Sequence, residues 1–458
     1  MIALVACTPP PSGELVVLHT NDMHGHIEPE KATWLEGDPA IGGMRAIGAR
    51  VARHRREGDV LVLDAGDLLS GTPYAQTKRG GAIGGAMVEV LEAVGYDAWA
   101  VGNHEFDHGV ANTEALIAHS AVAALNANAE PRLQGALPSL VVTRGALRIG
   151  LIGVVTDRLD SVVAPTQLGE SRGGDIAAAV RPEVERLDPD TDLIIVISHI
   201  GVEPDKELAA AVDGIDLIVG GHSHTALREA LEVGDTRIVQ AGSYARSLGT
   251  VRLHVADDRI TDFDYELVDL VEEPTEVPAK VDALHAELLA EVAAEWGVVI
   301  GVAEEDLQEG RDVLSDVGLW ACARLREAAE VDIAVYNSGG LRAPFFAGEL
   351  TRRDVFSVFP FDNTVVTFGL SAEDIETLAS LAGDDVQYAG MTLSPLSVGG
   401  APLETRTYTV ATNSFMFEKW AEYVPGTTPL EPEVQPQNVR EVMEAAVRAA
   451  PVRREPRP

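Results

Sequence analysis

Short apolar runs that end beside a histidine, aspartate or asparagine are the feature that most constrains the fold of this chain. Between Leu15 and about Val268 these runs alternate with helix-like stretches, a pattern typical of an α/β or layered sheet domain. Because functional side chains gather at strand ends that a rigid sheet holds in place, such endings predict one convergent site. The runs are Leu15 to Leu18, Val60 to Leu63, Ala98 to Val101, Ile149 to Val155, Leu193 to Ile197 and Ile215 to Val219.

The length of 458 residues predicts more than one domain, because single cores stop growing at about 250–300 residues. An acidic, proline-containing stretch from Glu272 to Pro278 separates two α/β patterns, and apolar residues then repeat at helical spacing from Val281 to Trp296. We expect a leader and tether (1–13), a first domain (14–270), a linker with a connecting helix (271–297), a smaller second domain (298–450) and a disordered tail (451–458).

The charge balance excludes some partners. Acidic residues outnumber basic ones 72 to 35, which gives a net charge of −37. A negative field of this size repels nucleic acid, so a nucleic-acid-binding role is disfavoured, and an anionic substrate must meet a local group of arginines. The sequence has no apolar stretch of about 18 residues, so we predict no transmembrane segment.

The two cysteines, Cys7 and Cys322, form neither a metal-finger motif nor a disulfide framework. The run from Leu4 to Cys7 resembles a bacterial lipobox, which implies a lipid anchor at Cys7 and a periplasmic or cell-surface location. No positive n-region and no full apolar h-region precede it. Two readings stay open, a start codon placed too late or a chance match, and we favour the lipoprotein.

Five of the run endings supply metal-type ligands. A single histidine is more often a hydrogen-bonded core or surface residue than a ligand, but the joint pattern reverses that expectation. Oxygen and nitrogen ligands without a thiolate suit pairs of Zn, Mn, Fe or Mg ions. The segments are Asp22 to His24, Asp64 to Asp67, Asn103 to Asp107, His199, and Gly220 to His224.

These strings resemble the calcineurin-type metallophosphoesterases. Together with the second half, from about Leu15 to Trp420, they resemble the bacterial 5′-nucleotidase and UDP-sugar hydrolase family. The resemblance implies an α/β fold of two domains: a four-layer β-sandwich flanked by helices, then a connecting helix and a smaller C-terminal α/β substrate-binding domain.

The resemblance also implies two divalent metal ions, Zn, Mn or Mg. Asp67 would bridge them, and His224 stands where relatives have Gln or Asn. The implied ligands of the first metal are Asp22, His24, Asp67 and His224, and those of the second are Asp67, Asn103, His199 and His222.

His104 and Asp107 match the catalytic pair of the family. A metal-activated water would attack phosphorus in line. His104, held protonated by Asp107, would stabilise the developing charge or donate a proton to the leaving oxygen.

In the second half the string from Asn337 to Arg342 resembles the nucleotide-site motif of the family, and Arg311 and Arg342 offer forked donors to phosphate. Aromatic rings at Phe361 and Phe415 match the pair that stacks on a base. The implied substrate residues are Arg311, Asn337, Gly340, Arg342, Phe361 and Phe415.

Two departures weaken the nucleoside site. Met416 to Trp420 stands where relatives carry a Gly-Gly-Asp-Gly segment, and Leu314 to Gly318 replaces another family segment. The leading hypothesis is a nucleotide phosphoesterase that acts on nucleoside monophosphates, nucleotide sugars or cyclic nucleotides. The alternatives are a relative that acts on a non-nucleotide phosphate or sulfur ester, and a non-catalytic surface binding protein. The second alternative is disfavoured because Asp67, Asn103, His104 and His222 are all present. Metal identity, base preference and oligomeric state stay open.

Overall fold

The computed structural model describes residues 12–271, 274–310, 313–383 and 385–457, so the lipobox-like run and Arg311 lie outside the described residues. The chain separates into two compact units. The first unit comprises the chain to Ser70 and Tyr74–Ala290, and the second comprises Gly71–Pro73 and Glu291–Pro458. The connecting helix α8 (Ala279–Trp296) begins in the first unit and ends in the second.

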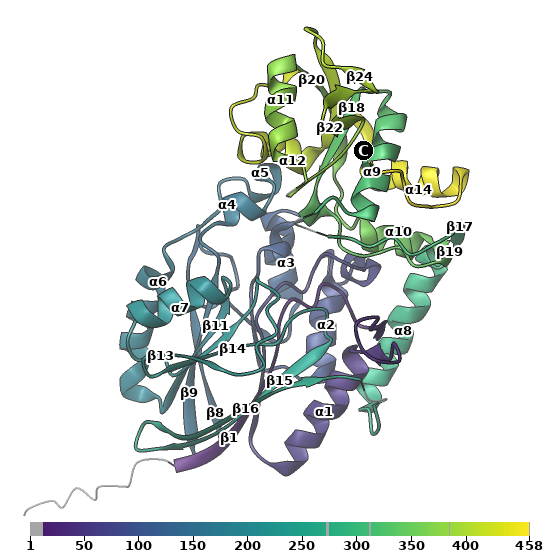
Figure 1. Ribbon diagram of the computed structural model, residues 1–458. Helices are drawn as coiled ribbons and strands as arrows, with labels where there is room; N and C mark the ends of the chain where they lie inside the picture. Colours follow the sequence, from purple (N-terminus) through teal and green to yellow (C-terminus); the bar gives the residue numbers. More distant parts are fainter. Residues whose placement is uncertain (1–11, 272–273, 311–312, 384, 458) are drawn as a thin grey trace, which may run out of the picture. The chain divides into compact units, whose positions relative to one another are not determined.

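The first unit contains two six-stranded sheets (Figure 1). One has the order β16-β15-β1-β4-β5-β6, and the other has the order β13-β14-β12-β11-β9-β8. The strands of the first sheet are β1 (Ser12–Thr20), β4 (Val60–Asp64), β5 (Ala98–Ala100), β6 (Ala123–Leu125), β15 (Ser247–Ala256) and β16 (Ile260–Asp269). Those of the second are β8 (Ser139–Arg144), β9 (Leu147–Val155), β11 (Leu193–His199), β12 (Leu217–Gly220), β13 (Leu231–Val233) and β14 (Thr236–Gln240).

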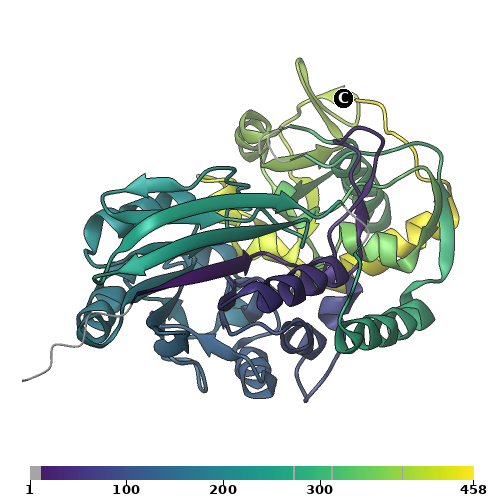
Figure 2. The same cartoon turned by 90° about the horizontal axis from the view of Figure 1, so that it is seen from below.

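Alternate residues of both sheets form one buried core. Leu15, Val17 and Leu63 of the first sheet cluster with Ile195 and Val219 of the second, as expected where two sheets pack face to face. The long pair β15 and β16 lies beside β1 in the first sheet (Figure 2). Helices cover the outer faces, which gives the layered α/β fold predicted from the sequence (Figure 1). They include α1 (Met44–Glu57), α2 (Gly85–Val94), α3 (Val110–His119), α6 (Ile176–Leu187) and α7 (Val202–Ala211).

The strands that carry the expected ligands are parallel and end together. Thr20 of β1 pairs with Asp64 of β4, and Ser198 of β11 pairs with Gly220 of β12. β5 runs parallel to β4 on its other side. Parallel neighbours end at the same edge of a sheet, so the loops that follow β1, β4 and β5 emerge together, as do those that follow β11 and β12.

The second unit is built on a five-stranded sheet of order β21-β18-β25-β20-β26. Its largest core cluster includes Trp320 and Phe345, whose rings meet edge to face at 5.4 Å. The strands are β18 (Ile333–Asn337), β20 (Thr364–Leu370), β21 (Val386–Ala389), β25 (Tyr408–Asn413) and β26 (Leu430–Asn438). The main helices are α9 (Asp316–Ala329), α10 (Arg352–Val358), α11 (Ala372–Leu381), α12 (Ser414–Glu418) and α14 (Val439–Ala449).

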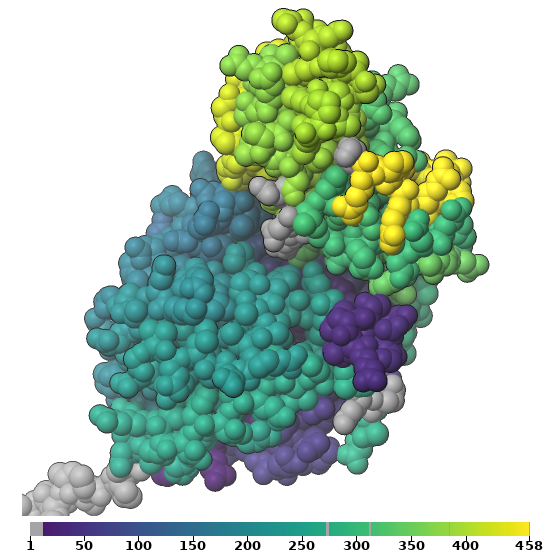
Figure 3. Space-filling view, viewed as in Figure 1, coloured from purple at the N-terminus to yellow at the C-terminus, as the bar shows by residue number. Residues whose placement is uncertain are grey.

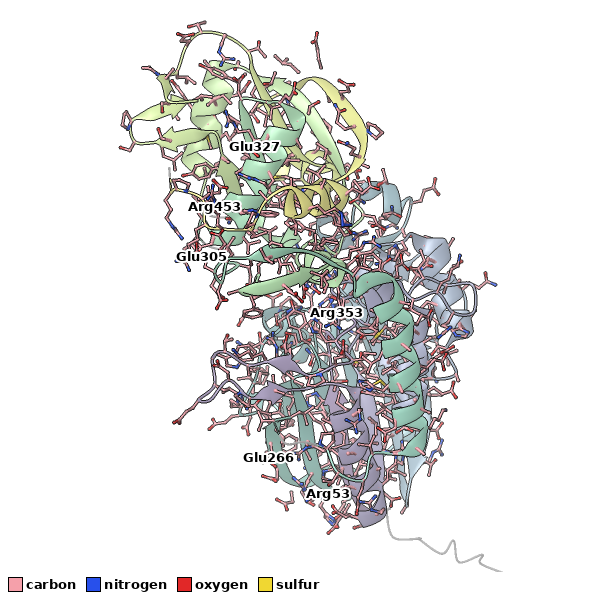
Figure 4. All side chains as sticks on the ribbon, turned by 90° about the vertical axis from the view of Figure 1, so that its right-hand side faces the viewer. Arg53, Glu266, Glu305, Glu327, Arg353 and Arg453 are labelled. Carbon is pink, nitrogen blue, oxygen red and sulfur yellow. The ribbon has the colours of Figure 1, made fainter. Side chains whose placement is uncertain are left out.

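The C-terminal tail differs from the disorder predicted for 451–458. Val452 is fully buried and exchanges two backbone hydrogen bonds of 2.9 Å with the β17 segment (Val299–Ala303) and the residue that follows it. Arg454 and Arg457 bind the two carboxylate oxygens of Asp316 at 3.0 and 3.1 Å. Figure 3 shows this yellow C-terminal segment against the green chain of the second unit, and Figure 4 shows Arg453 and Glu305 on the same edge. A basic tail thus finds acidic partners on its own domain, which composition alone does not reveal.

Among the described residues, no helix is both long and apolar enough to cross a membrane.

Candidate metal centre

The ends of five strands of the first unit, with the loops that follow them, bring the predicted ligands into one buried cluster. Three groups of side chains each place their ligand atoms within 4.8 Å of one another. The groups are Asp22 with His24 and His224, His24 with Asp67 and His104, and Asp67 with His199 and His222. Shared members join them, so the cluster is continuous.

The first group faces three ligand atoms toward one point. Nε2 of His224 lies 3.2 Å from Asp22 Oδ1 and 3.1 Å from His24 Nε2. His24 Nδ1 lies 2.8 Å from the carbonyl oxygen of Leu69, to which it donates a hydrogen bond. This bond leaves the lone pair of a neutral His24 on Nε2, toward the cluster, as in metal-bound histidines.

The third group, Asp67 with His199 and His222, repeats the arrangement. His199 Nδ1 lies 2.6 Å from the carbonyl oxygen of Ala65, and its Nε2 lies 3.0 Å from Asp67 Oδ2. Burial alone lowers the pKa of His199, but the carboxylates of Asp67 and Asp22 outweigh it and raise the pKa to about 10. The two carboxylates therefore favour positive charge at Nε2 of His199, which either a proton or a metal cation supplies.

Asn103 and His222 complete this side of the cluster, with Asn103 Oδ1 2.7 Å from His222 Nδ1. Burial, followed by the neighbouring His199, lowers the pKa of His222 to about 4. His222 is therefore neutral at physiological pH, and a neutral imidazole is the form that binds a metal.

The cluster fits a pair of cations on chemical grounds. Among the described residues, Asp22 Oδ1 and His199 Nε2 are buried polar atoms that make no hydrogen bond of good geometry. Buried polar atoms are nearly always satisfied, so a bound cation next to each atom explains both of them. Carboxylate, amide and imidazole donors are the set that Zn and Mn accept.

Five of the seven expected ligands have left-handed backbone. The φ values are 51° for Asp22, 48° for His24, 58° for Asp67, 74° for His222 and 54° for His224. Such a conformation costs an L residue roughly 1 kcal/mol, and strained residues gather at functional sites. Gly102 is also required here, because a Cβ at this position would lie 2.3 Å from Asp67 Oδ1.

The predicted catalytic pair lies at the rim of the cluster. His104 Nδ1 is 2.7 Å from Asp107 Oδ2, and His104 Nε2 is 3.9 Å from Asp67 Oδ2. The backbone N–H of His104 donates to Asp67 Oδ1 at 2.8 Å. Asp107 Oδ2 also accepts a hydrogen bond from the hydroxyl of Ser70. The His104 ring therefore points one nitrogen at a carboxylate and the other at the metal cluster.

Glu105 is a site residue to which the sequence reasoning gave no role. Its fully buried carboxylate accepts backbone N–H groups from Asp67, Leu68, Leu69 and Gly102 at 2.7–3.2 Å. Burial, with the nearby charge of Asp67, raises its pKa to about 7. Glu105 thus holds the loop that follows β4 against the loop that follows β5. Its only sequence signal was its place between His104 and Phe106.

Asn21 is the second missed residue. Its amide Nδ2 donates to Asp22 Oδ2 at 2.6 Å and to the Gly242 carbonyl at 2.5 Å, and its Oδ1 accepts from Ala241 at 2.8 Å. Asn21 therefore fixes the Asp22 carboxylate to the loop that follows β14.

The predicted substrate residues of the second unit lie near the ends of β18 and β25. Buried Asn337 ends β18, and its Oδ1 accepts from Asn413 at 2.8 Å. Gly340 is required because a Cβ there would lie 2.7 Å from the Tyr336 ring. The Arg342 guanidinium lies 6.0 Å from the centre of the half-buried Phe361 ring.

The segment that departs from the family pattern is helical. Asn413 caps α12 by accepting the Met416 N–H at 2.9 Å. Phe415 on this helix is half-buried, and its ring centre lies 6.5 Å from that of Tyr423. Phe361 and Phe415 are therefore both accessible enough to meet a ligand.

Comparison with known proteins matches both units. Residues 15–226 match the calcineurin-like phosphoesterase family, and residues 299–426 match the 5′-nucleotidase C-terminal domain. A probable 5′-nucleotidase of Treponema pallidum is 29% identical over 476 residues, which cover 85% of this chain and 78% of the relative. The structure of a 5′-nucleotidase precursor from Thermus thermophilus has a TM-score of 0.82 at 26% identity and covers 95% of this chain and 96% of its own. The sulfate thiohydrolase SoxB of the same organism shares the fold, with a TM-score of 0.79 at 20% identity over 98% of this chain and 96% of its own.

Proposed function

The chain belongs to the 5′-nucleotidase family of calcineurin-like phosphoesterases, which are metal-dependent hydrolases of phosphoester bonds, and we propose that its substrates are nucleotides. The observation that carries the proposal is the buried cluster of carboxylate, amide and imidazole groups at the ends of five strands. This cluster occurs together with a second domain of the 5′-nucleotidase type.

Members of this family use two divalent metal ions, and the cluster supplies two overlapping ligand sets. We assign Asp22, His24 and His224 to one ion and Asn103, His199 and His222 to the other, with Asp67 shared. Asp67 suits the shared position because its carboxylate contacts His199 and lies 3.9 Å from His24 Nε2. The bound ions supply a nucleophilic water and neutralise charge on the phosphoryl group.

Residues of the chain then orient the His104 ring and supply a proton to the leaving group. Because Asp107 accepts from His104 Nδ1, the other ring nitrogen is the one presented to substrate. A protonated His104 Nε2 donates to the leaving oxygen or to a charged phosphoryl oxygen as the bond to phosphorus breaks, which contributes about 10²–10⁴ in rate. Glu105 keeps the backbone of Asp67 and Gly102 in place during this step.

The nucleotide part of the proposal is supported by the second unit. Asn337, Gly340 and Arg342 lie on one strand end and its loop, and Phe361 and Phe415 offer rings for base stacking. The likeness to a sulfate thiohydrolase is a likeness of fold alone and does not favour another ester. A non-nucleotide phosphate or sulfur ester remains the alternative, since Met416 to Trp420 has no Gly-Gly-Asp-Gly segment.

A substrate and metal panel tests the proposal. Metal-stripped protein is refilled with Mn, Zn or Mg and assayed with AMP, UMP, a 2′,3′-cyclic nucleotide, UDP-glucose, an aryl phosphate and thiosulfate-type esters. We expect kcat/KM for at least one nucleotide to exceed that for the aryl phosphate by about tenfold or more, as one stacked base provides. If kcat/KM for the aryl phosphate equals or exceeds that for every nucleotide, the enzyme is a general phosphatase and the nucleotide assignment is wrong.

We also propose a periplasmic or cell-surface location, with a lipid anchor at Cys7. Its support is the lipobox-like run from Leu4 to Cys7 and the proline-rich tether that follows. Mass spectrometry of protein made from the full upstream reading frame tests it. An unmodified Cys7 contradicts the anchor.

A further inference from the structure

Ser70 lies against the catalytic pair, although no motif in the sequence marks it. Its residue is 2% exposed, and its hydroxyl donates to Asp107 Oδ2, the same oxygen that lies 2.7 Å from His104 Nδ1. Ser70 has a left-handed φ of 62°, which glycine adopts freely and serine rarely. A serine kept in a glycine-type conformation indicates that its hydroxyl has a use.

We propose that Ser70 is a positioning residue that fixes the Asp107 carboxylate and, through it, the His104 ring. The importance of this for turnover rests on the proposed function of His104. A carboxylate bound to one partner can still rotate about its side-chain bonds, so a ring that depends on it is loosely aimed. A second donor on the same oxygen, from the loop that follows β4, removes that freedom. His104 Nε2 then stays directed toward the metal cluster, 3.9 Å from Asp67 Oδ2.

The consequence for catalysis depends on the leaving group. An alkoxide such as the ribose 5′-oxygen of a nucleotide is a poor leaving group and needs a proton as it departs, whereas a nitrophenolate leaves without one. Loss of the Ser70 contact should therefore slow hydrolysis of AMP more than hydrolysis of p-nitrophenyl phosphate. A purely structural role would lower both rates together.

Steady-state kinetics of Ser70→Ala and Ser70→Gly, each loaded with metal, test this difference. We expect kcat for AMP to fall about tenfold in both variants, as for other supporting contacts behind a site, with KM nearly unchanged. kcat for p-nitrophenyl phosphate should change less than about twofold. Ser70→Gly also relieves the left-handed backbone, so a loss in both variants cannot come from strain. An unchanged ratio of the two kcat values in both variants overturns the proposal.

Ser247→Ala is the matched control, because Ser247 is also buried and donates its hydroxyl to a carboxylate, Asp269, at 2.8 Å. This bond joins β15 to β16, and Ser247 is not a member of the metal-ligand groups. We expect its kinetics to match those of the unmodified protein.

Proton NMR gives a readout that needs no substrate. The His104 Nδ1–H resonance at low field is identified by its absence in His104→Ala, and it should shift in Ser70→Ala and stay in place in Ser247→Ala. If the unmodified protein does not hydrolyse AMP at all, the proposed function fails while this resonance still decides the role of Ser70. A resonance that does not move in Ser70→Ala overturns the proposal.

Discussion

The two units hold their predicted site residues in different ways. In the first unit, five of the seven expected metal ligands have left-handed backbone, and four backbone N–H groups on one carboxylate keep their loops together. In the second unit, Asn337 has an ordinary φ of −74°, and none of the described substrate residues has a positive φ. The predicted metal ligands are therefore held on strained backbone, whereas the predicted substrate residues lie on backbone of ordinary conformation.

This difference indicates where precision is needed. Two cations and an attacking water tolerate little displacement, so geometry at the metal cluster is fixed even at a cost in backbone energy. Stacking on aromatic rings tolerates different bases and small shifts, so the second unit can do without such strain. Substitutions should accordingly affect chemistry in the first unit and substrate affinity in the second.

The largest effect is expected for Asp67→Asn. Loss of the shared carboxylate removes charge from both ligand sets, so we expect at least one metal equivalent to be lost and kcat/KM for AMP to fall by about 10⁴ or more. Metal analysis and steady-state kinetics measure both. Asp216→Asn is the control. This half-buried carboxylate of the same unit accepts a hydrogen bond of 2.7 Å from the Ile194 N–H and is not a member of the metal-ligand groups. Full metal content in Asp67→Asn would contradict the shared role.

His104→Ala comes next. His104 contributes a proton rather than holding the cluster together, so the variant should keep both metals while kcat for AMP falls by about 10²–10⁴. Metal analysis and kcat on the same preparation separate the two effects. Unchanged kcat would reject His104 as the proton donor, and lost metal would make it a ligand.

Phe361→Ala and Phe415→Ala test the substrate side. If each ring stacks on the base, its removal should raise KM for AMP about tenfold, which corresponds to about 1.4 kcal/mol. kcat/KM for p-nitrophenyl phosphate should stay within about twofold, because the metal cluster is untouched. Phe417→Ala is the matched control for packing loss. Phe417 lies on α12, as Phe415 does, and its ring centre lies 5.4 Å from that of Phe368. Equal losses for both substrates would place the two rings in the core rather than in a nucleoside site.

The smallest effect concerns backbone strain that has no function. Glu330 is exposed and caps the C-terminus of α9 directly after Ala329, with a φ of 52°. Glycine favours this helix-end position, so Glu330→Gly should stabilise the protein by about 0.5–1 kcal/mol with unchanged kcat and KM. Thermal unfolding followed by circular dichroism measures the gain. A loss of activity would show that strain in the second unit is also functional.

Much of the fold and the cluster was predictable because the signals are local. Apolar runs predicted the strands, and each ligand lies within a few residues of a strand end, so topology alone brought Asp22, Asp67 and His199 together. Their metal-binding roles remain predictions that the structure makes chemically reasonable. Glu105 and Ser70 were not predictable in this way, because their partners are backbone groups or side chains on a loop distant in sequence.

For the C-terminal tail, composition predicted disorder and the structure differs. Its proline and arginine content predicts disorder, yet Arg454 and Arg457 find Asp316, and Val452 fills a place in the core. Composition describes a segment by itself and gives no information on the surface of the folded domain against which the segment packs. An acidic domain can order a basic segment that would be disordered in isolation.

The left-handed backbone at the ligand positions restricts which amino acids can replace the present ones. A replacement must bind a metal and must also tolerate a positive φ, and asparagine, aspartate and histidine meet both requirements best. The β-branched residues fail the second requirement, and glutamate adopts a positive φ less readily than these three, although Glu330 does so. His224, with a φ of 54°, is one of these positions. A shift in metal preference can then occur by exchange among asparagine, aspartate and histidine, without a change in the backbone conformation of the loop.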